Sequence, residues 1–79
     1  MKTLELTQKF ALVEYQKSTL EYYNPSIVIE ADTLEELEAL EISDYIDEGA
    51  TVGCTIVEKT DDGLIDVYTC EEFSMKSYN

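Results

Sequence analysis

The sequence predicts an α+β domain, with one small antiparallel or mixed sheet and one short helix packed on one face, in the order ββαββ. Three observations lead to this class. Two apolar segments with strand character come first, a capped helix follows, and a period-two pattern then surrounds a turn near residue 62. Because 79 residues bury one modest core, we expect a single domain over residues 1–79, with residues 73–79 as a frayed C-terminal tail.

The first strand is predicted at residues 8–15, QKFALVEY, where apolar and aromatic side chains alternate between two faces. A helix within residues 7–23 remains an alternative, because apolar residues also recur three or four apart and Thr7 is placed to cap it. The second strand is predicted at residues 26–31, SIVIEA, which is rich in β-branched side chains. It follows Asn24-Pro25, a signal for a turn or for entry into a strand.

The helix has the best-defined start in the chain. Thr33 and Glu36 have the spacing of a capping box, and the acidic pair one residue earlier offers a cap in the adjacent register. An apolar stripe is expected to face the sheet while the Glu side chains stay in solvent. The stripe consists of Leu34, Leu37 and Leu40. Ser43 is placed to cap a further turn, which Gly49 is expected to end in the left-handed conformation.

A β-hairpin is predicted around residues 61–63, because side-chain character alternates with period two on both sides of this turn signal. The preferred three-residue loop, Asp-Asp-Gly, places Cys54 opposite Cys70. A two-residue loop, taken to pair Lys59 with Asp66, is the alternative. In the preferred register we predict that both cysteines are small core residues. Because they would lie opposite each other, oxidation could join them in a disulfide.

The preferred register divides the hairpin side chains between two faces of the sheet. Under the helix it places Val52, Cys54, Ile56, Tyr68 and Cys70. On the opposite face it places an apolar patch of Val57, Ile65 and Val67. This patch needs a cover, which is either the N-terminal segment with Phe10, Leu12 and Tyr15 or a second copy of the chain. In the second case the three residues would form a homodimer face.

The charge of the chain restricts its partners. Eighteen Asp and Glu against five Lys and no Arg give a net charge of −13, which argues against direct nucleic-acid binding and favours basic or neutral partners. Crowded carboxylates repel one another, so we expect added salt to stabilise the fold and some Glu between residues 30 and 48 to have a raised pKa. The chain has no signal-peptide pattern and no apolar run of membrane-spanning length, so we predict a cytoplasmic protein without membrane contact.

The residues that carry most enzyme chemistry are missing from the sequence. It has no His, no Gly-rich phosphate loop and no metal-ligand cluster, so we predict no enzymatic activity, no cofactor and no metal. Residues 58–69 resemble a calcium loop in their acidic positions, but the twelfth residue is Thr69 where such a loop needs a bidentate Glu.

The most unusual segment is acidic. Nine carboxylates lie between Glu30 and Glu48 without a single Lys or Arg. The simplest interpretation is the solvated face of an amphipathic helix, although a helix selected for stability would mix charges to form i,i+4 pairs. The functional interpretation is a surface that imitates a phosphate backbone and occupies a basic groove on a nucleic-acid-binding protein. We predict the binding residues to be Glu35, Glu36, Glu38, Glu41, Asp44, Tyr45, Asp47 and Glu48.

The junction SIVIEADTLEELEAL, residues 26–40, resembles the strand-to-helix junction of many small phage and prophage proteins, although Leu37 stands where such helices commonly have Ala. Together with its size, acidity and ββαββ order, the chain resembles acidic phage inhibitors of the DNA-mimic type, which include anti-CRISPR and anti-restriction proteins. This resemblance implies a non-enzymatic inhibitor that acts on a nucleic-acid enzyme in the host cytoplasm. The alternative is a small structural or assembly protein that forms a homodimer through the second face of its hairpin.

Overall fold

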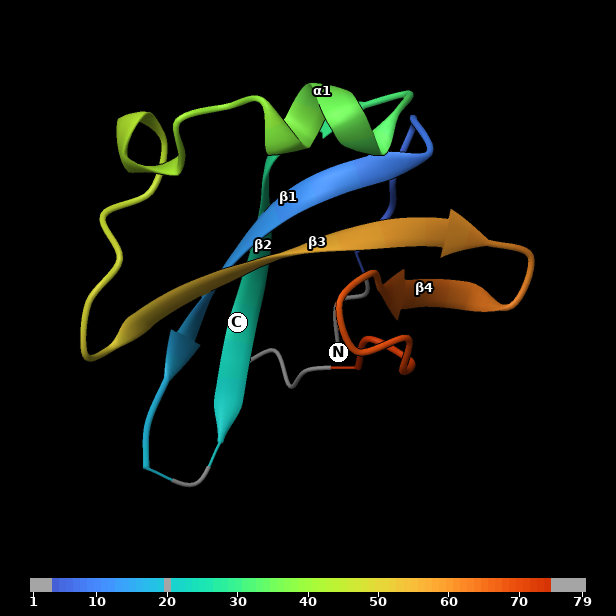
Figure 1. Ribbon diagram of the computed structural model, residues 1–79. Helices are drawn as coiled ribbons and strands as arrows, with labels where there is room; N and C mark the ends of the chain where they lie inside the picture. The colour runs from blue at the N-terminus through green and yellow to red at the C-terminus, as the bar shows by residue number, and fades with distance from the viewer. Residues whose placement is uncertain (1–3, 20, 75–79) are drawn as a thin grey trace.

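The computed structural model describes residues 4–19 and 21–74 and contains one four-stranded antiparallel sheet (Figure 1). The strands lie side by side in the order β2-β1-β3-β4. Along the chain the elements are β1 (Phe10–Lys17), β2 (Tyr22–Ala31), α1 (Leu34–Glu38), the 3-10 helix η1 (Ile42–Asp44), β3 (Val52–Thr60) and β4 (Gly63–Asp66).

The predicted α+β class with the order ββαββ is wrong, because the chain is mainly sheet and its order is ββαηββ. Helix α1 has only 5 residues, whereas β2 alone has 10. The apolar stripe suggested a helix that reached Leu40, but Glu41 is already extended, with φ −82° and ψ 103°. The chain leaves the helix there and forms η1, beyond which the buried Ile46 rejoins the core.

Strand β1 lies between β2 and β3, and this settles the choice between strand and helix for residues 10–17. Strand β2 begins at Tyr22, earlier than the predicted strand at residues 26–31. Asn24 has a φ of 52°, and the pairing with β1 shifts between Glu14 and Gln16. The Asn24-Pro25 signal therefore marks an irregularity inside an edge strand, where a missing backbone N–H is tolerated.

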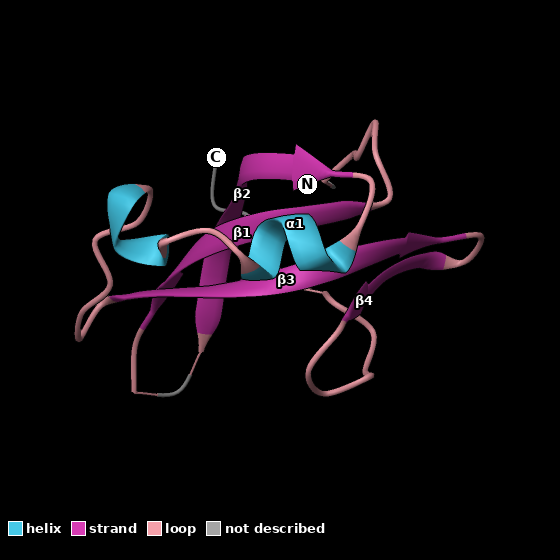
Figure 2. Cartoon of the chain, turned by 45° about the horizontal axis from the view of Figure 1, so that its top comes forward, coloured by secondary structure: helices cyan, strands magenta, loops and turns pink. Residues whose placement is uncertain are grey.

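Two apolar clusters cover the two faces of the sheet. Helix α1 lies against one face of the sheet (Figure 2) and contacts β1 and β2; on this side the buried residues are Leu12, Ala31, Leu37, Ile46 and Ile56. On the opposite side they are Leu6, Ala11, Val13 and Val57. Ala11, Val13 and Val57 are 0% exposed, because the N-terminal segment and Phe73 pack over them. The sheet is thus covered on both faces by the chain itself.

The hairpin has a two-residue loop, Asp61-Asp62, and pairs Thr60 with Gly63 and Lys59 with Leu64. Both predicted registers are therefore wrong. The preferred one assigned Gly63 to the loop, whereas Gly63 is the first residue of β4, with a φ of 137°. The alternative had the right loop length but the wrong partner for Lys59. Strand β4 also ends at Asp66, so the predicted ladder does not continue to residue 70.

The new register corrects the predicted faces. Val52, Cys54 and Ile56 belong to the helix-side cluster as predicted, whereas Tyr68 is 62% exposed and Cys70 is exposed. The two cysteines are free and do not face each other.

The three residues of the predicted dimer face lie in different parts of the structure. Val57 is fully buried, Val67 packs against the helix-side cluster, and Ile65 forms an isolated bridge with Glu72, so the three side chains do not form one patch. The cover over Val57 comes from Leu6 rather than from Phe10 and Leu12, which belong to the other face.

Phe73, the first residue of the predicted C-terminal tail, is packed against the sheet. The backbone N–H of Phe73 donates to the carbonyl of Leu64 over 2.8 Å, and its ring packs in the cluster opposite α1. Residues 75–79 of the predicted tail lie outside the described residues.

Candidate functional site

The acidic segment starts at a helix cap with the predicted geometry. The Thr33 hydroxyl oxygen accepts a hydrogen bond from the backbone N–H of Glu36, and the backbone N–H of Thr33 donates to the Glu36 carboxylate, each over 3.4 Å. This is the capping box in the Thr33–Glu36 register. It satisfies two backbone donors that a helix start leaves unpaired, and it fixes the direction in which α1 leaves β2.

The second half of the segment differs from the prediction. Glu41, not Ser43, is the N-cap of η1, and no side chain caps this turn. The turn closes through the backbone, because the N–H groups of Tyr45 and Ile46 both donate to the carbonyl of Ile42. Gly49 does not have the positive φ that was predicted for it. The segment therefore depends on its buried side chains rather than on caps beyond α1.

Two apolar side chains hold the acidic segment against the sheet. Leu37 and Ile46 are each 2% exposed and belong to the helix-side cluster. Because these side chains turn inward, the polar side chains between them turn outward. The sequence pattern behind this arrangement is one buried apolar residue, Leu37 or Ile46, with exposed acidic residues on both sides of it.

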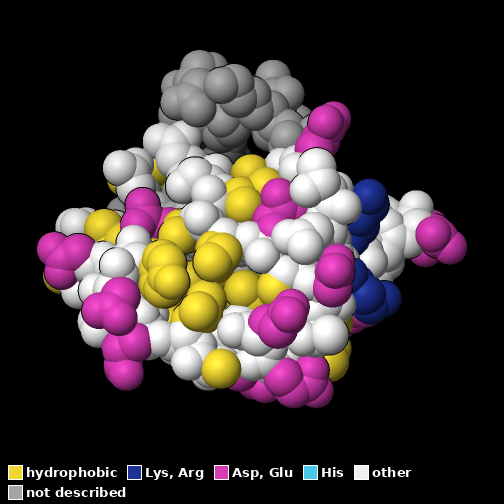
Figure 3. Space-filling model, turned by 90° about the horizontal axis from the view of Figure 1, so that it is seen from above, with side chains coloured by type: hydrophobic (Ala, Val, Ile, Leu, Met, Phe, Trp, Pro, Cys, Tyr) yellow, Lys and Arg dark blue, Asp and Glu magenta, His cyan; other side chains and the backbone are white. Residues whose placement is uncertain are grey.

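All eight predicted binding residues are exposed, and we call them the acidic face: Glu35, Glu36, Glu38, Glu41, Asp44, Tyr45, Asp47 and Glu48. Figure 3 views the molecule from the side of α1, where Asp and Glu side chains surround an apolar patch and the visible Lys side chains lie at one border. Tyr45 is 46% exposed and adds an aromatic ring to the acidic face.

No residue of the acidic face forms a salt bridge within the described part of the chain. Among the described residues a salt bridge joins Lys9 to Glu58 over 3.0 Å, and the Lys59 ammonium donates to the carbonyl of Leu6. Both lysines lie near the end of the sheet where Phe10 pairs with Ala31, and neither forms a salt bridge with a residue of the acidic face within the described part of the chain. The negative potential over α1 and η1 stays available for an external cation.

Other carboxylates have structural roles instead. The Glu30 carboxylate accepts the backbone N–H groups of Thr7, at 2.7 Å, and Gln8, at 3.0 Å. These bonds, that of Gln8 first, lower the pKa of Glu30 below its ordinary value of 4.5. Glu30 thus goes against the expectation of raised pKa values in the acidic stretch, because backbone donors stabilise its charged form.

Asp66 is a residue that the sequence analysis did not single out as a functional candidate. Its carboxylate accepts the Thr55 hydroxyl at 2.8 Å and the backbone N–H groups of Tyr68 and Thr69 at 2.9 and 3.3 Å. The Asp-Val-Tyr-Thr spacing is typical of an Asp that closes the turn after it, and this signal would have predicted the end of β4.

Cys54 lies beside the acidic face but is not suited to thiol chemistry. Burial raises the pKa of its thiol to about 11, and the neighbouring Glu48 carboxylate adds to the shift. At neutral pH the side chain is a neutral thiol, which is a poor nucleophile.

The described residues contain no group of three or more potential metal ligands, and no helix among them has the length and apolar character needed to cross a membrane. Neither observation identifies a ligand for the acidic face. No protein-family model matches the chain, and neither a curated protein nor a solved structure matches it. The inference of function therefore rests on the geometry and charge of the site.

Proposed function

We propose that the protein is a non-enzymatic binding protein whose acidic face occupies a basic, nucleic-acid-binding site on a partner protein. The observation that carries this proposal is the exposure of all seven carboxylates of the acidic face without a salt bridge among the described residues. The cost of this like-charge repulsion is offset when the surface meets Lys and Arg of a partner.

The scaffold supports such a role because the acidic face is held in place before binding. The capping box fixes the start of α1, and Leu37 and Ile46 anchor the segment at two positions among the exposed carboxylates. Side chains on a preordered segment lose less conformational entropy on association than those on a flexible loop. Within α1, Glu35 and Glu38 are three residues apart, which places their Cβ atoms about 5–6 Å apart, a spacing that basic grooves built for phosphates can engage.

The resemblance to acidic phage inhibitors is in keeping with this proposal and adds a partner class. The partner would be a nucleic-acid enzyme or a defence complex of a bacterial host. The runner-up, an assembly protein that dimerises through its hairpin, required Val57, Ile65 and Val67 to share an exposed face. With Val57 fully buried, no observation favours that function.

The test is affinity capture from a bacterial lysate at low and high salt. The tagged protein is compared with a variant carrying Glu35→Gln, Glu38→Gln and Glu41→Gln, which spares the capping residue Glu36. A matched control removes three exposed charges elsewhere, through Glu5→Gln, Asp61→Asn and Asp62→Asn.

The expected result is a nucleic-acid-binding protein that the wild type and the control retain and that the acidic-face variant loses. A DNA duplex added to the beads should release the same partner, because both ligands use one basic site. Equal retention by all three proteins, or retention that DNA does not affect, would contradict the proposal.

A further inference from the structure

Strand β3 has an outer edge that is only half covered. On one side, β1 pairs with residues 52–58 of β3, from Phe10 opposite Glu58 to Gln16 opposite Val52. On the other side, β4 pairs only with residues 57–60 (Figure 1). On this outer side, residues 52–56 therefore have no strand beside them among the described residues. An exposed strand edge is a template for pairing with another extended chain.

The direction of the backbone groups along this edge follows from two hydrogen bonds. Lys59 N–H donates to the Lys9 carbonyl at 2.7 Å, and Lys17 N–H donates to the Thr51 carbonyl at 2.9 Å. Since backbone groups alternate in direction along a strand, the odd-numbered residues of β3 bond to β1 and the even-numbered residues point outward.

Two of the outward carbonyls are satisfied by the chain itself. The Ile56 carbonyl accepts from Val67 N–H at 3.0 Å, and the Val52 carbonyl accepts from Gly49 N–H at 3.1 Å. Between them, the N–H and the carbonyl of Cys54 have no hydrogen-bond partner among the described residues. One residue thus offers a donor and an acceptor side by side at the centre of the open edge.

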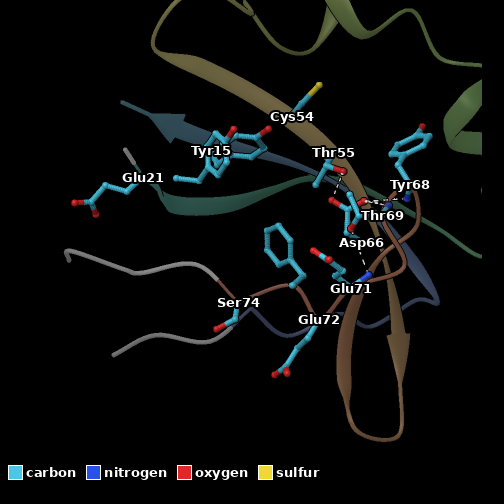
Figure 4. A pocket seen from close by; sticks show the side chains of 12 residues that line it. Tyr15, Glu21, Cys54, Thr55, Asp66, Tyr68, Thr69, Glu71, Glu72 and Ser74 are labelled. Atoms are coloured by element: carbon cyan, nitrogen blue, oxygen red, sulfur yellow. Dashed lines mark hydrogen bonds between the residues drawn. The ribbon is translucent and has the colours of Figure 1, made fainter. Parts of the chain in front are cut away.

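This edge borders a hollow of about 530 Å³ on the protein surface. Its lining contains four aromatic and four acidic side chains and no Lys or Arg, and it includes Tyr15, Glu21, Asp66, Tyr68, Glu71 and Glu72. Figure 4 shows that these residues come from different segments around β3, with the Cys54 thiol directed away from Glu71 and Glu72. The hollow therefore meets the backbone edge of Cys54 and not its thiol.

One aromatic side chain of the hollow, Tyr15, packs directly against the backbone of β3. The ring of Tyr15 lies so close to Gly53 that a Cβ at that position would come within 2.7 Å of it. Gly53 thus permits Tyr15 to lie flat across β3, where the ring also contacts Tyr22 edge to face at 5.2 Å between centroids. Aromatic faces beside carboxylates attract Lys and Arg side chains.

We propose that residues 52–56 of β3 bind an extended, basic segment of a partner protein as an additional strand. The segment pairs with the N–H and the carbonyl of Cys54, and every second side chain points into the hollow. The charge of the hollow selects Lys or Arg at those positions. This site is separate from the acidic face, because its carboxylates belong to residues 21 and 66–72 rather than to residues 35–48.

The experiment uses amide hydrogen exchange of the full chain with a synthetic peptide, blocked at both ends, in which Lys alternates with Val and Thr. In the free protein the Cys54 N–H should exchange quickly, whereas the inward Thr55 N–H is protected. With the peptide at about 100 times its Kd, exchange at Cys54 should slow by about 100-fold. The same peptide with N-methyl groups on alternate backbone nitrogens should bind about fivefold more weakly or worse, since it loses a hydrogen bond.

Variants separate this site from the acidic face. Glu71→Gln with Glu72→Gln should weaken peptide binding severalfold at low salt, whereas the matched pair Asp61→Asn with Asp62→Asn should not. Cys54→Pro removes the outward N–H and no bond to β1, so it should abolish the pairing if the variant folds. Should that variant not fold, exchange at Cys54 in the wild type remains decisive.

Three results would overturn the proposal. The first is peptide binding that leaves exchange at Cys54 unchanged, and the second is binding that Glu35→Gln, Glu38→Gln and Glu41→Gln abolish. The third is protection of Cys54 that rises with protein concentration alone, accompanied by a dimer in sedimentation, because a second copy would then occupy the edge. The first and third results have no bearing on whether the acidic face binds a nucleic-acid-binding protein.

Discussion

Carboxylates occupy two contrasting settings in this molecule. Asp66 and Glu30 accept backbone or hydroxyl hydrogen bonds that hold a turn and the N-terminal segment in place. On the acidic face, Glu38 and Glu41 are exposed, and their carboxylates accept no hydrogen bond among the described residues. The carboxylates that make up the net charge of −13 therefore have two different roles. Some carboxylates stabilise the fold, and others are carried by a fold that does not need them.

The largest expected effect comes from removing the anchor beneath the acidic face. Leu37→Ala should lower the free energy of unfolding by about 2–5 kcal/mol, because Leu37 is 2% exposed and its loss leaves a cavity under α1. Urea denaturation measures this loss. Glu38→Ala, at an exposed neighbouring position, serves as the control and should change stability by less than about 0.5 kcal/mol. A similar loss in both variants would contradict the packing described here.

A carboxylate with structural partners should be costly to neutralise. Asp66→Asn weakens the acceptor for the Thr55 hydroxyl and for two backbone N–H groups, so we expect a loss of about 1–3 kcal/mol in urea denaturation. Asp44→Asn removes the same charge from the acidic face and should cost less than about 0.5 kcal/mol. Equal effects of the two substitutions would remove the distinction between the two settings.

The pH dependence of stability should show the contribution of the Glu30 carboxylate. Its pKa lies below the ordinary value of 4.5 in the folded state, so its stabilising effect is present above that value and is lost as the pH falls through the lowered pKa. The Glu30→Gln variant lacks this titration. Thermal unfolding from neutral pH to strongly acidic pH should therefore show the two proteins converging in stability at low pH. A constant difference throughout would contradict the lowered pKa.

The smallest effect concerns the acidic face itself. Glu35→Gln, Glu38→Gln and Glu41→Gln remove repulsion, so unfolding free energy should rise slightly, by roughly 0.5 kcal/mol or less. Added salt should stabilise the wild type more than this variant, because salt screens the charges that the variant lacks. Thermal melts over a salt series test both points. A marked loss of stability would mean that these carboxylates have structural partners after all.

The sequence predicted those features whose partners lie close together in the chain. Thr33 and Glu36 are three residues apart, so their capping box could be recognised without knowing the fold. The exposure of Glu35 and Glu38 follows from the same local pattern around Leu37. The length of α1 could not be predicted in this way, because the need to bury Ile46 against the sheet ends the helix early.

Features that depend on distant residues were missed or misjudged. The hairpin register differs from both predictions because the turn after β4, closed by Asp66, removes residues 67–70 from the ladder. The hollow beside Cys54 has no local signature, since its lining combines residues from β1, from the start of β2, from β3 and from the segment 66–74. The position of β1 between β2 and β3 is likewise a property of the whole sheet.

The central claim is that the acidic face is a binding surface. Its most direct test is the association rate of the captured nucleic-acid-binding partner with three proteins: the wild type, the acidic-face variant with Gln at residues 35, 38 and 41, and the control variant altered at Glu5, Asp61 and Asp62. The account predicts that at low salt the acidic-face variant associates about tenfold more slowly, or slower still, while the control stays close to the wild type. Equal association rates for the acidic-face variant and its control would contradict the claim and leave these carboxylates as a solvated surface.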